Sequence, residues 1–349
     1  MPDVLAFPSV LQADGRGCLP GGTWRPAERN MPNGLSKLLK STYRMLSRYP
    51  AVVRWREAFR KNVQMHYWPW YRLPPRRPGT DPNARYEHEL IVSLTSFPAR
   101  IHLVRYAIHS LLKQSLKPNR LVLWLGEDKF PGKEADLPAE LLALKALGLE
   151  IRWCEDVKSA TKLIPSLREW PDAIIVTADD DLHYPRPWLE SLYQSYLEHD
   201  TDINSGAIEA IVWDEKGMPR PFGEWEWNPA DSQSAFGNTQ VAGFGALYPP
   251  HSLHPDVLDA NAFLRLSPSA DDLWFWAMAV RHGTKIHLVQ KNRQQPFVDP
   301  RAHQTPSLWS QNSAGGGNDR CFANLLEAYP ELLERIQEEI TNVQRHAAI

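Results

Sequence analysis

Four apolar runs of strand length, separated by helical patterns, constrain the fold of this chain most strongly. The runs occupy residues 90–95, 120–125, 150–154 and 172–178. Helical patterns lie between them at residues 102–113, 138–147 and 162–170, and the second opens with a proline that suits a first helical position. This alternation predicts an α/β fold, with a mostly parallel sheet and helices on both faces.

Three consecutive acids, Asp179, Asp180 and Asp181, follow the fourth apolar run and precede the turn-forming pair Tyr184-Pro185. Open α/β sheets bind ligands beyond the carboxyl ends of their strands. A divalent ion held by one or two carboxylates completes its shell with phosphate oxygens and water. The triplet therefore predicts a metal site for a nucleotide diphosphate, although a solvated acidic turn explains the three residues equally well when they are considered alone.

The end of the first apolar run is expected at the same rim of the sheet. Right-handed crossovers bring residues 95–100 beside the acidic triplet, which adds two hydroxyls and a guanidinium to the crevice. The predicted ligand-binding residues of this crevice are therefore Thr95, Ser96, Arg100, Asp179 and Asp180, together with Lys162 at the start of the third helical pattern.

A second acidic pair, Asp271-Asp272, stands in the first turn of an apolar helical pattern that continues through residues 273–278. Capping accounts for this pair by itself, because Ser269 suits an N-cap position and acids in a first turn are favoured by the helix dipole.

Four motifs in order give the chain a family resemblance. IVSLTSFPARI, LVLWLGEDKFP, IIVTADDDLHYP and SADDLWFW resemble bacterial glycosyltransferases of the GT-A fold, close to the family-2 type, over residues 89–297. The resemblance implies a nucleotide-sugar donor, with UDP-sugar expected, a Mn or Mg ion, and inverting transfer of a glycosyl group to an acceptor hydroxyl. The Gln-x-x-Arg-Trp signature of processive family-2 polymerases is absent, which favours addition of single residues.

The resemblance also implies roles for individual residues. Asp181 first and Asp179 second would coordinate the metal, and the end of the first strand would contact the nucleoside. Asp272 would be the general base with Asp271 as its neighbour, and such a base contributes about 10²–10⁴ in rate. His303, before the glycine-rich stretch 310–318, is the candidate for an additional metal ligand, and an ordinary surface histidine is the alternative. That stretch is expected to form a mobile lid.

Between the acidic motifs, residues 213–227 hold three tryptophans and residues 241–250 hold two glycines flanked by aromatics. We expect these segments to form the acceptor side of the cleft. The aromatics could equally fill the core. Gly243 and Gly245 would allow a close backbone approach or a tight bend.

Residues 35–80 are strongly basic, with eleven Lys or Arg against the single acid Glu57, while the whole chain carries a formal charge of -2. Their apolar residues recur at helical spacing, and an aromatic cluster follows at residues 66–71. This pattern predicts attachment to an anionic membrane surface and hence a glycan or lipid-linked saccharide acceptor. The alternative is a pair of helices packed on the catalytic domain. Nucleic acid is not the expected partner.

The expected organisation is a disordered segment 1–34, the basic extension 35–85, a GT-A domain 86–300, and a lid with a C-terminal helix at 301–349. The sequence has no run long enough to span a bilayer and no signal-peptide core, so we expect a cytoplasmic protein, peripheral on the inner face of the membrane. Cys18, Cys154 and Cys321 are too few and scattered for a disulfide framework. Two other functions remain open: a metal-dependent phosphohydrolase and a non-catalytic carbohydrate-binding protein with a GT-A-like fold.

Overall fold

The structure is a computed structural model that describes residues 73–215, 217–230, 232–289, 295–299, 301–302 and 316–347, with side chains up to residue 342. The chain divides into two units, residues 1–67 and 68–349. The description below concerns the second unit.

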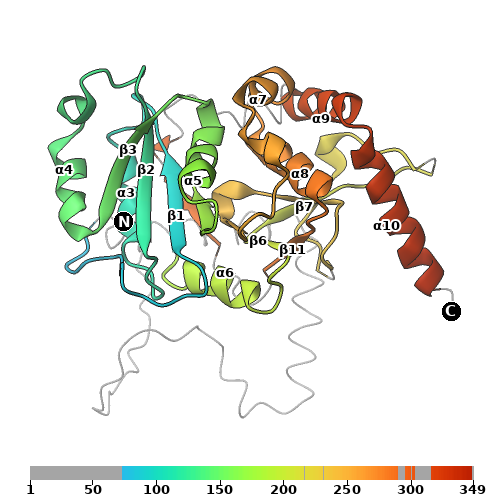
Figure 1. Ribbon diagram of the computed structural model, residues 1–349, viewed down its shortest axis with the longest axis horizontal. Coiled ribbons are helices and arrows are strands. Elements are labelled where there is room, and N and C mark those ends of the chain that lie inside the picture. Colours follow the sequence, from blue (N-terminus) through green and yellow to red (C-terminus); the bar gives the residue numbers. More distant parts are fainter. Residues whose placement is uncertain are drawn as a thin grey trace, which may run out of the picture. The chain divides into compact units, whose positions relative to one another are not determined.

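A seven-stranded sheet forms the centre of this unit, in the order β11-β6-β10-β4-β1-β2-β3 (Figure 1). Its parallel half consists of the four predicted strands, which are β1 (Leu90–Thr95), β2 (Arg120–Gly126), β3 (Leu149–Cys154) and β4 (Ile174–Ala178). Beyond β4, the antiparallel strand β10 (Ala246–Tyr248) leads to the parallel pair β6 (Ile203–Ser205) and β11 (Ile286–Leu288).

Every residue of β1 except the last is buried, and successive side chains enter two different cores. Leu90, Val92 and Leu94 pack with α3 (Val104–Leu111), α4 (Ala139–Leu142) and α6 (Trp188–Tyr196). Ile91 belongs to the opposite core, with α5 (Ile164–Glu169), α7 (Ala260–Leu266) and α8 (Asp271–His282). Two buried faces explain why the strand sequences are continuously apolar. The predicted Rossmann-like, mostly parallel sheet with flanking helices is confirmed, whereas residues 35–72 of the predicted helical N-terminal extension lie outside the described residues.

Two of the predicted helices are interrupted. Pro138 is the N-cap of α4 and not its first residue, and α4 continues as the 3-10 helix η3 (Ala143–Leu147), which ends at Gly148 with φ +103°. The third helical pattern is divided between η4 (Lys158–Lys162) and α5, because the chain leaves helical geometry at Leu163, where φ is −123°. This break places Lys162 at the end of a 3-10 turn.

Short elements complete the unit. A three-stranded sheet has the order β8-β7-β9, and β5 pairs with β12. No helix within the described ranges is both long enough and apolar enough to cross a bilayer. The remaining elements are η2 (Lys133–Asp136), β5 (Leu182–His183), β7 (Ile208–Ala210), η5 (Phe222–Glu224), β8 (Glu226–Trp227), β9 (Asn238–Gln240), η6 (Ala242–Phe244), η7 (Pro255–Leu258), β12 (Phe297–Val298), α9 (Gly317–Ala328) and α10 (Glu331–Ala347).

Candidate active site

The candidate site lies where the strand order reverses. From β1 the chain moves outward to β2 and β3, then returns to the other side of β1 as β4. Ligands of open α/β sheets bind at this switch point, beyond the carboxyl ends of the strands. Thr95 ends β1 there and is followed by Ser96 and Arg100, and the triplet Asp179–Asp181 follows β4.

Arg100 and Ser96 hold the second and third acids of the triplet. The Ser96 hydroxyl donates to Asp180 Oδ2 at 2.6 Å, and Arg100 Nη1 donates to Asp180 Oδ1 at 2.9 Å. The same guanidinium nitrogen donates to Asp181 Oδ2 at 2.8 Å. Both oxygens of the buried Asp180 are therefore occupied by the protein, and Asp180 ties the end of β4 to the loop after β1.

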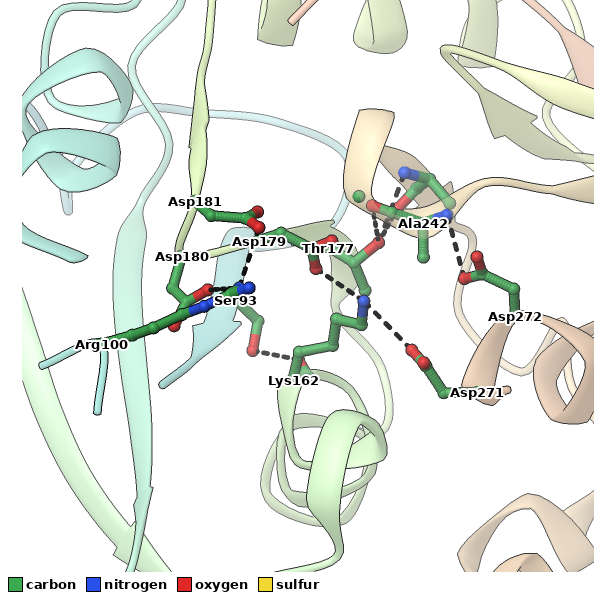
Figure 2. A network of polar contacts seen from close by, with 12 residues as sticks. Ser93, Arg100, Lys162, Thr177, Asp179, Asp180, Asp181, Ala242, Asp271 and Asp272 are labelled. Atoms are coloured by element: carbon green, nitrogen blue, oxygen red, sulfur yellow. Dashed lines mark hydrogen bonds and ion pairs between the residues drawn. The ribbon is translucent and has the colours of Figure 1, made fainter. Parts of the chain in front are cut away.

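Lys162 joins the two acidic motifs that are far apart in sequence (Figure 2). Its ammonium donates to Asp179 Oδ1 at 2.7 Å and lies 3.1 Å from Asp271 Oδ2 on α8. The side chain is almost fully buried, at 5% exposure for the residue. Burial alone would lower the pKa of this ammonium, but Asp179, Asp271 and Asp272 raise it well above its ordinary value. Lys162 is thus a permanent cation between the two carboxylate groups.

Buried hydroxyls on the sheet fix the position of Lys162. Ser93 on β1 donates to the Lys162 carbonyl at 2.6 Å and lies 2.9 Å from the Ser166 hydroxyl. Ser166 also accepts from Trp124 Nε1 of β2 at 2.8 Å. Sequence reasoning did not identify Ser93 or Ser166. Ser93 could have been found as the polar residue in the middle of the otherwise apolar strand β1, whereas Ser166 lies on α5.

The η6 segment completes the wall beside Asp179. Tyr184 accepts from the Asp179 amide at 2.7 Å and donates to the Gly243 carbonyl at 2.8 Å. A Cβ at Gly243 would lie 2.2 Å from Asp179 Oδ2, so only glycine fits against this carboxylate in its present position. Gly243 therefore allows a close approach to the triplet itself, whereas the prediction was an approach to a ligand. Gly245 adopts φ +100° against the Trp188 ring, which agrees with the predicted bend.

Asp271 and Asp272 face the site and do not cap their own helix. The N-cap of α8 is Ala270, with no side-chain cap bond, and Ser269 Oγ instead lies 3.9 Å from Cys321 Sγ. The prediction of a Ser269 N-cap is therefore wrong, whereas both acids do lie in the first turn of α8, as predicted. Asp272 Oδ1 accepts from the Ala242 amide at 3.1 Å, because η6 supplies a backbone donor from another part of the chain.

Burial and like charge set the protonation of these carboxyls. Burial raises the pKa of Asp272 well above its ordinary value, and the charge of Asp271 raises it further, against an opposing effect of Lys162. Burial, followed by the charges of Asp180 and Asp179, raises the pKa of Asp181 to about 7. Raised pKa values on adjacent carboxyls are typical of catalytic sites.

The donor set fits a divalent cation. Asp179 Oδ2 and Asp181 Oδ1 accept no hydrogen bond from the described residues. Five carboxylates, Asp179–Asp181 with Asp271 and Asp272, surround the two cations Arg100 and Lys162, which leaves an excess of negative charge when all are ionised. Three protein ligand atoms do not converge here in the described part of the chain. Two carboxylates with phosphate oxygens and water suit Mg or Mn.

Two predicted residues have other outcomes. The Thr95 hydroxyl donates to the Trp124 carbonyl at 2.9 Å and so joins β1 to β2. His303 lies outside the described residues.

The segment before His303 approaches the triplet, since the Asp299 amide donates to the Asp181 carbonyl at 2.7 Å. Asp299 also binds Arg301 Nη2 at 2.8 Å and lies 3.2 Å from His183 Nε2.

The aromatic segment 213–227 divides between core and surface. Trp225 is buried against Phe222 and Phe322, which agrees with the core interpretation. Trp227 on β8 is 45% exposed and packs edge-on against Phe244 of η6, with ring centroids 5.5 Å apart. One tryptophan is thus free on the surface beside the segment that adjoins the triplet.

No protein-family model matches this sequence, and no curated protein sequence matches it either. Among solved structures, a mannosyltransferase from Pyrobaculum calidifontis, in complex with GDP-Man and Mn²⁺, is similar at 14% identity with a TM-score of 0.36, over 69% of this chain and 68% of its own. A 4-diphosphocytidyl-2C-methyl-D-erythritol synthase is similar at 10% identity with a TM-score of 0.37, over 63% of this chain and 97% of its own. Both likenesses are too distant to carry an argument about activity.

Proposed function

We propose that this protein is a metal-dependent glycosyltransferase that moves a sugar from a nucleotide-sugar donor to an acceptor hydroxyl. The observation that carries the proposal is the junction at Lys162. One buried cation holds a donor-side carboxylate, Asp179, and an acceptor-side carboxylate, Asp271, at 2.7 and 3.1 Å. Transfer between two substrates needs such a pair of adjacent acidic groups with different roles.

The donor would bind over the triplet. A Mn or Mg ion on Asp181 and Asp179 would stabilise the charge on the departing diphosphate. Arg100 and Lys162 lie beside these two carboxylates and add fixed positive charge. The nucleoside would lie toward the end of β1, at Thr95 and Ser96. UDP-sugars are the expected donors, and GDP-sugars belong in the same assay.

Asp272 would act as the general base. It accepts the proton of the acceptor hydroxyl while that oxygen bonds to the anomeric carbon and the bond from that carbon to the diphosphate oxygen breaks. The raised pKa makes the Asp272 carboxylate a stronger base toward the acceptor hydroxyl. Its side chain is only partly buried, so an acceptor can reach it. The Ala242 amide holds the carboxylate at 3.1 Å and fixes its direction. Trp227 would offer its exposed ring to the acceptor sugar.

Asp272→Asn tests the proposal directly. The amide keeps the size of the side chain and cannot take the proton, so turnover should fall about 10²–10⁴-fold while donor affinity is unchanged. Asp259→Asn is the matched control, because Asp259 caps α7 through the Ala262 amide and asparagine caps equally well.

The assay measures transfer from a panel of UDP- and GDP-sugars with and without Mn²⁺, and donor affinity by calorimetry. A loss of only a few-fold in Asp272→Asn would contradict the assignment of the base. Cleavage of the donor to a nucleoside monophosphate and a sugar phosphate, without transfer to an acceptor, would indicate a phosphohydrolase. Donor binding with no turnover in the wild type would indicate a non-catalytic protein.

The acceptor and the location of the enzyme depend on residues 35–80, of which 35–72 lie outside the described residues. We propose that this segment attaches the protein to an anionic inner-membrane surface that carries a lipid-linked saccharide acceptor. Each cation near such a surface contributes about 1 kcal/mol. Sedimentation with anionic and neutral vesicles, for the full chain and for a chain that begins at Asp81, tests the proposal. Equal sedimentation of both chains would contradict it.

A further inference from the structure

A second cluster of metal-binding side chains lies toward the other end of the sheet. Strands β4 and β6 run in the same direction, because both are antiparallel to β10. Asp202 precedes the start of β6, whereas the acidic triplet follows the end of β4. His199 follows α6, and His287 lies on the edge strand β11. Among the described residues, these three are the group whose ligand atoms all lie within 4.8 Å of one another.

The two imidazoles lie side by side. Their rings stack with centroids 3.7 Å apart. Burial lowers the pKa of His287, and the neighbouring His199 lowers it further, which favours the neutral form that metal binding requires. The Ser234 hydroxyl lies 3.0 Å from His287 Nδ1. When this hydroxyl accepts the Nδ1 proton, the Nε2 lone pair is left for a ligand. A hydrogen bond from the other ring nitrogen is usual for a metal-bound histidine.

Asp202 supplies the negative charge. Its carboxylate is partly buried and receives no hydrogen bond from the residues that the structure describes. A partly buried carboxylate that faces two imidazoles and has no other partner is placed to bind a cation, whereas a structural acid is normally hydrogen-bonded.

We propose that His199, Asp202 and His287 bind one divalent transition-metal ion of the zinc class. Two histidines and one carboxylate leave a fourth position for water in a tetrahedral shell. Imidazole ligands favour zinc, cobalt or nickel over magnesium. Binding turns the rings out of their stacked arrangement, so that one nitrogen of each points at the ion. The ion would tie the edge strand β11 to the segment between α6 and β6.

The test uses Zn²⁺ alone, on the full chain without nucleotide sugar. Equilibrium dialysis and thermal unfolding should show one saturable zinc and a rise in Tm. His199→Gln/His287→Gln should weaken this binding at least about tenfold. His251→Gln/His254→Gln is the matched control, because it also removes two histidines, and His251 is largely exposed. Asp181→Ala should retain the binding, which separates this site from the donor-side carboxylates.

A second variant covers the case in which the double substitution does not fold. The wild type with Co²⁺ should show the visible absorption of a tetrahedral ion, and Asp202→Asn, which leaves both rings in place, should abolish it. Equal zinc binding by the wild type and His199→Gln/His287→Gln would overturn the proposal. So would the absence of saturable binding in the wild type, or a Co²⁺ spectrum that Asp202→Asn leaves unchanged.

Discussion

Replacement of Lys162 by methionine tests the electrostatic arrangement of the site. Methionine fills a similar volume without the charge and leaves Asp179 and Asp271 without their cation. At a dielectric constant of about 20, the separations of 2.7 and 3.1 Å correspond to about 6 and about 5 kcal/mol of gross attraction, which desolvation largely offsets. Removal of one partner from a buried ion pair typically costs about 3–5 kcal/mol. The Asp179 side chain is 35% exposed, so we expect the lower end, about 3 kcal/mol.

The loss of stability should depend on pH. A raised pKa for Lys162 means that its own contribution is complete below the unfolded value and is lost only as the pH rises through the folded value. The unfolded value is about 10.4. Lys162 therefore stays charged below about pH 10, so the cost of its removal should be complete at neutral pH and should fall only at strongly alkaline pH.

Urea unfolding, followed by tryptophan fluorescence at several pH values, measures this cost. Lys162→Met/Asp271→Asn should recover about 1–2 kcal/mol, because it neutralises the more deeply buried carboxylate as well. Lys145→Met is the control, since its pair with Glu134 is about half exposed and should contribute at most about 1 kcal/mol. A loss below about 1 kcal/mol in Lys162→Met at neutral pH would refute the reasoning.

Three further variants test the surroundings. Gly243→Ala places a methyl group 2.2 Å from Asp179 Oδ2, so Mn²⁺ affinity in the presence of donor should fall about tenfold or more. Trp227→Ala should raise the acceptor KM and leave the donor KM unchanged, because the ring is 45% exposed. Burial raises the pKa of Glu209 to about 7, so wild-type stability should fall as pH rises from about 4.5 toward 7, by at most about 3 kcal/mol, and Glu209→Gln should abolish this fall. Unchanged Mn²⁺ affinity in Gly243→Ala would contradict the first argument, and an altered donor KM in Trp227→Ala would contradict the second. The third would be contradicted if the stability of Glu209→Gln and of the wild type changed with pH in the same way.

The sequence was sufficient for the four strands of the parallel half and for the position of the acidic triplet, but it did not predict the short strands β5 to β12. Strands buried on both faces need continuous apolar residues, so the run at 90–95 predicted β1 with its observed ends. The placement of Asp179 at the end of the fourth strand follows from strand length, and topology rules then put the end of β1 beside it. These inferences depend on local pattern and on general rules of chain connection.

Only the tertiary structure decided what the polar residues bind. Ser269 and Asp272 have the local spacing of a cap, yet Asp272 accepts from Ala242 and Asp271 pairs with Lys162, because donors from distant segments are closer than the helix's own amides. His199 and His287 likewise meet only because β11 pairs with β6. Hydrogen bonds and ion pairs act over a few ångströms, and residues so far apart in sequence come within that range only after the sheet has formed.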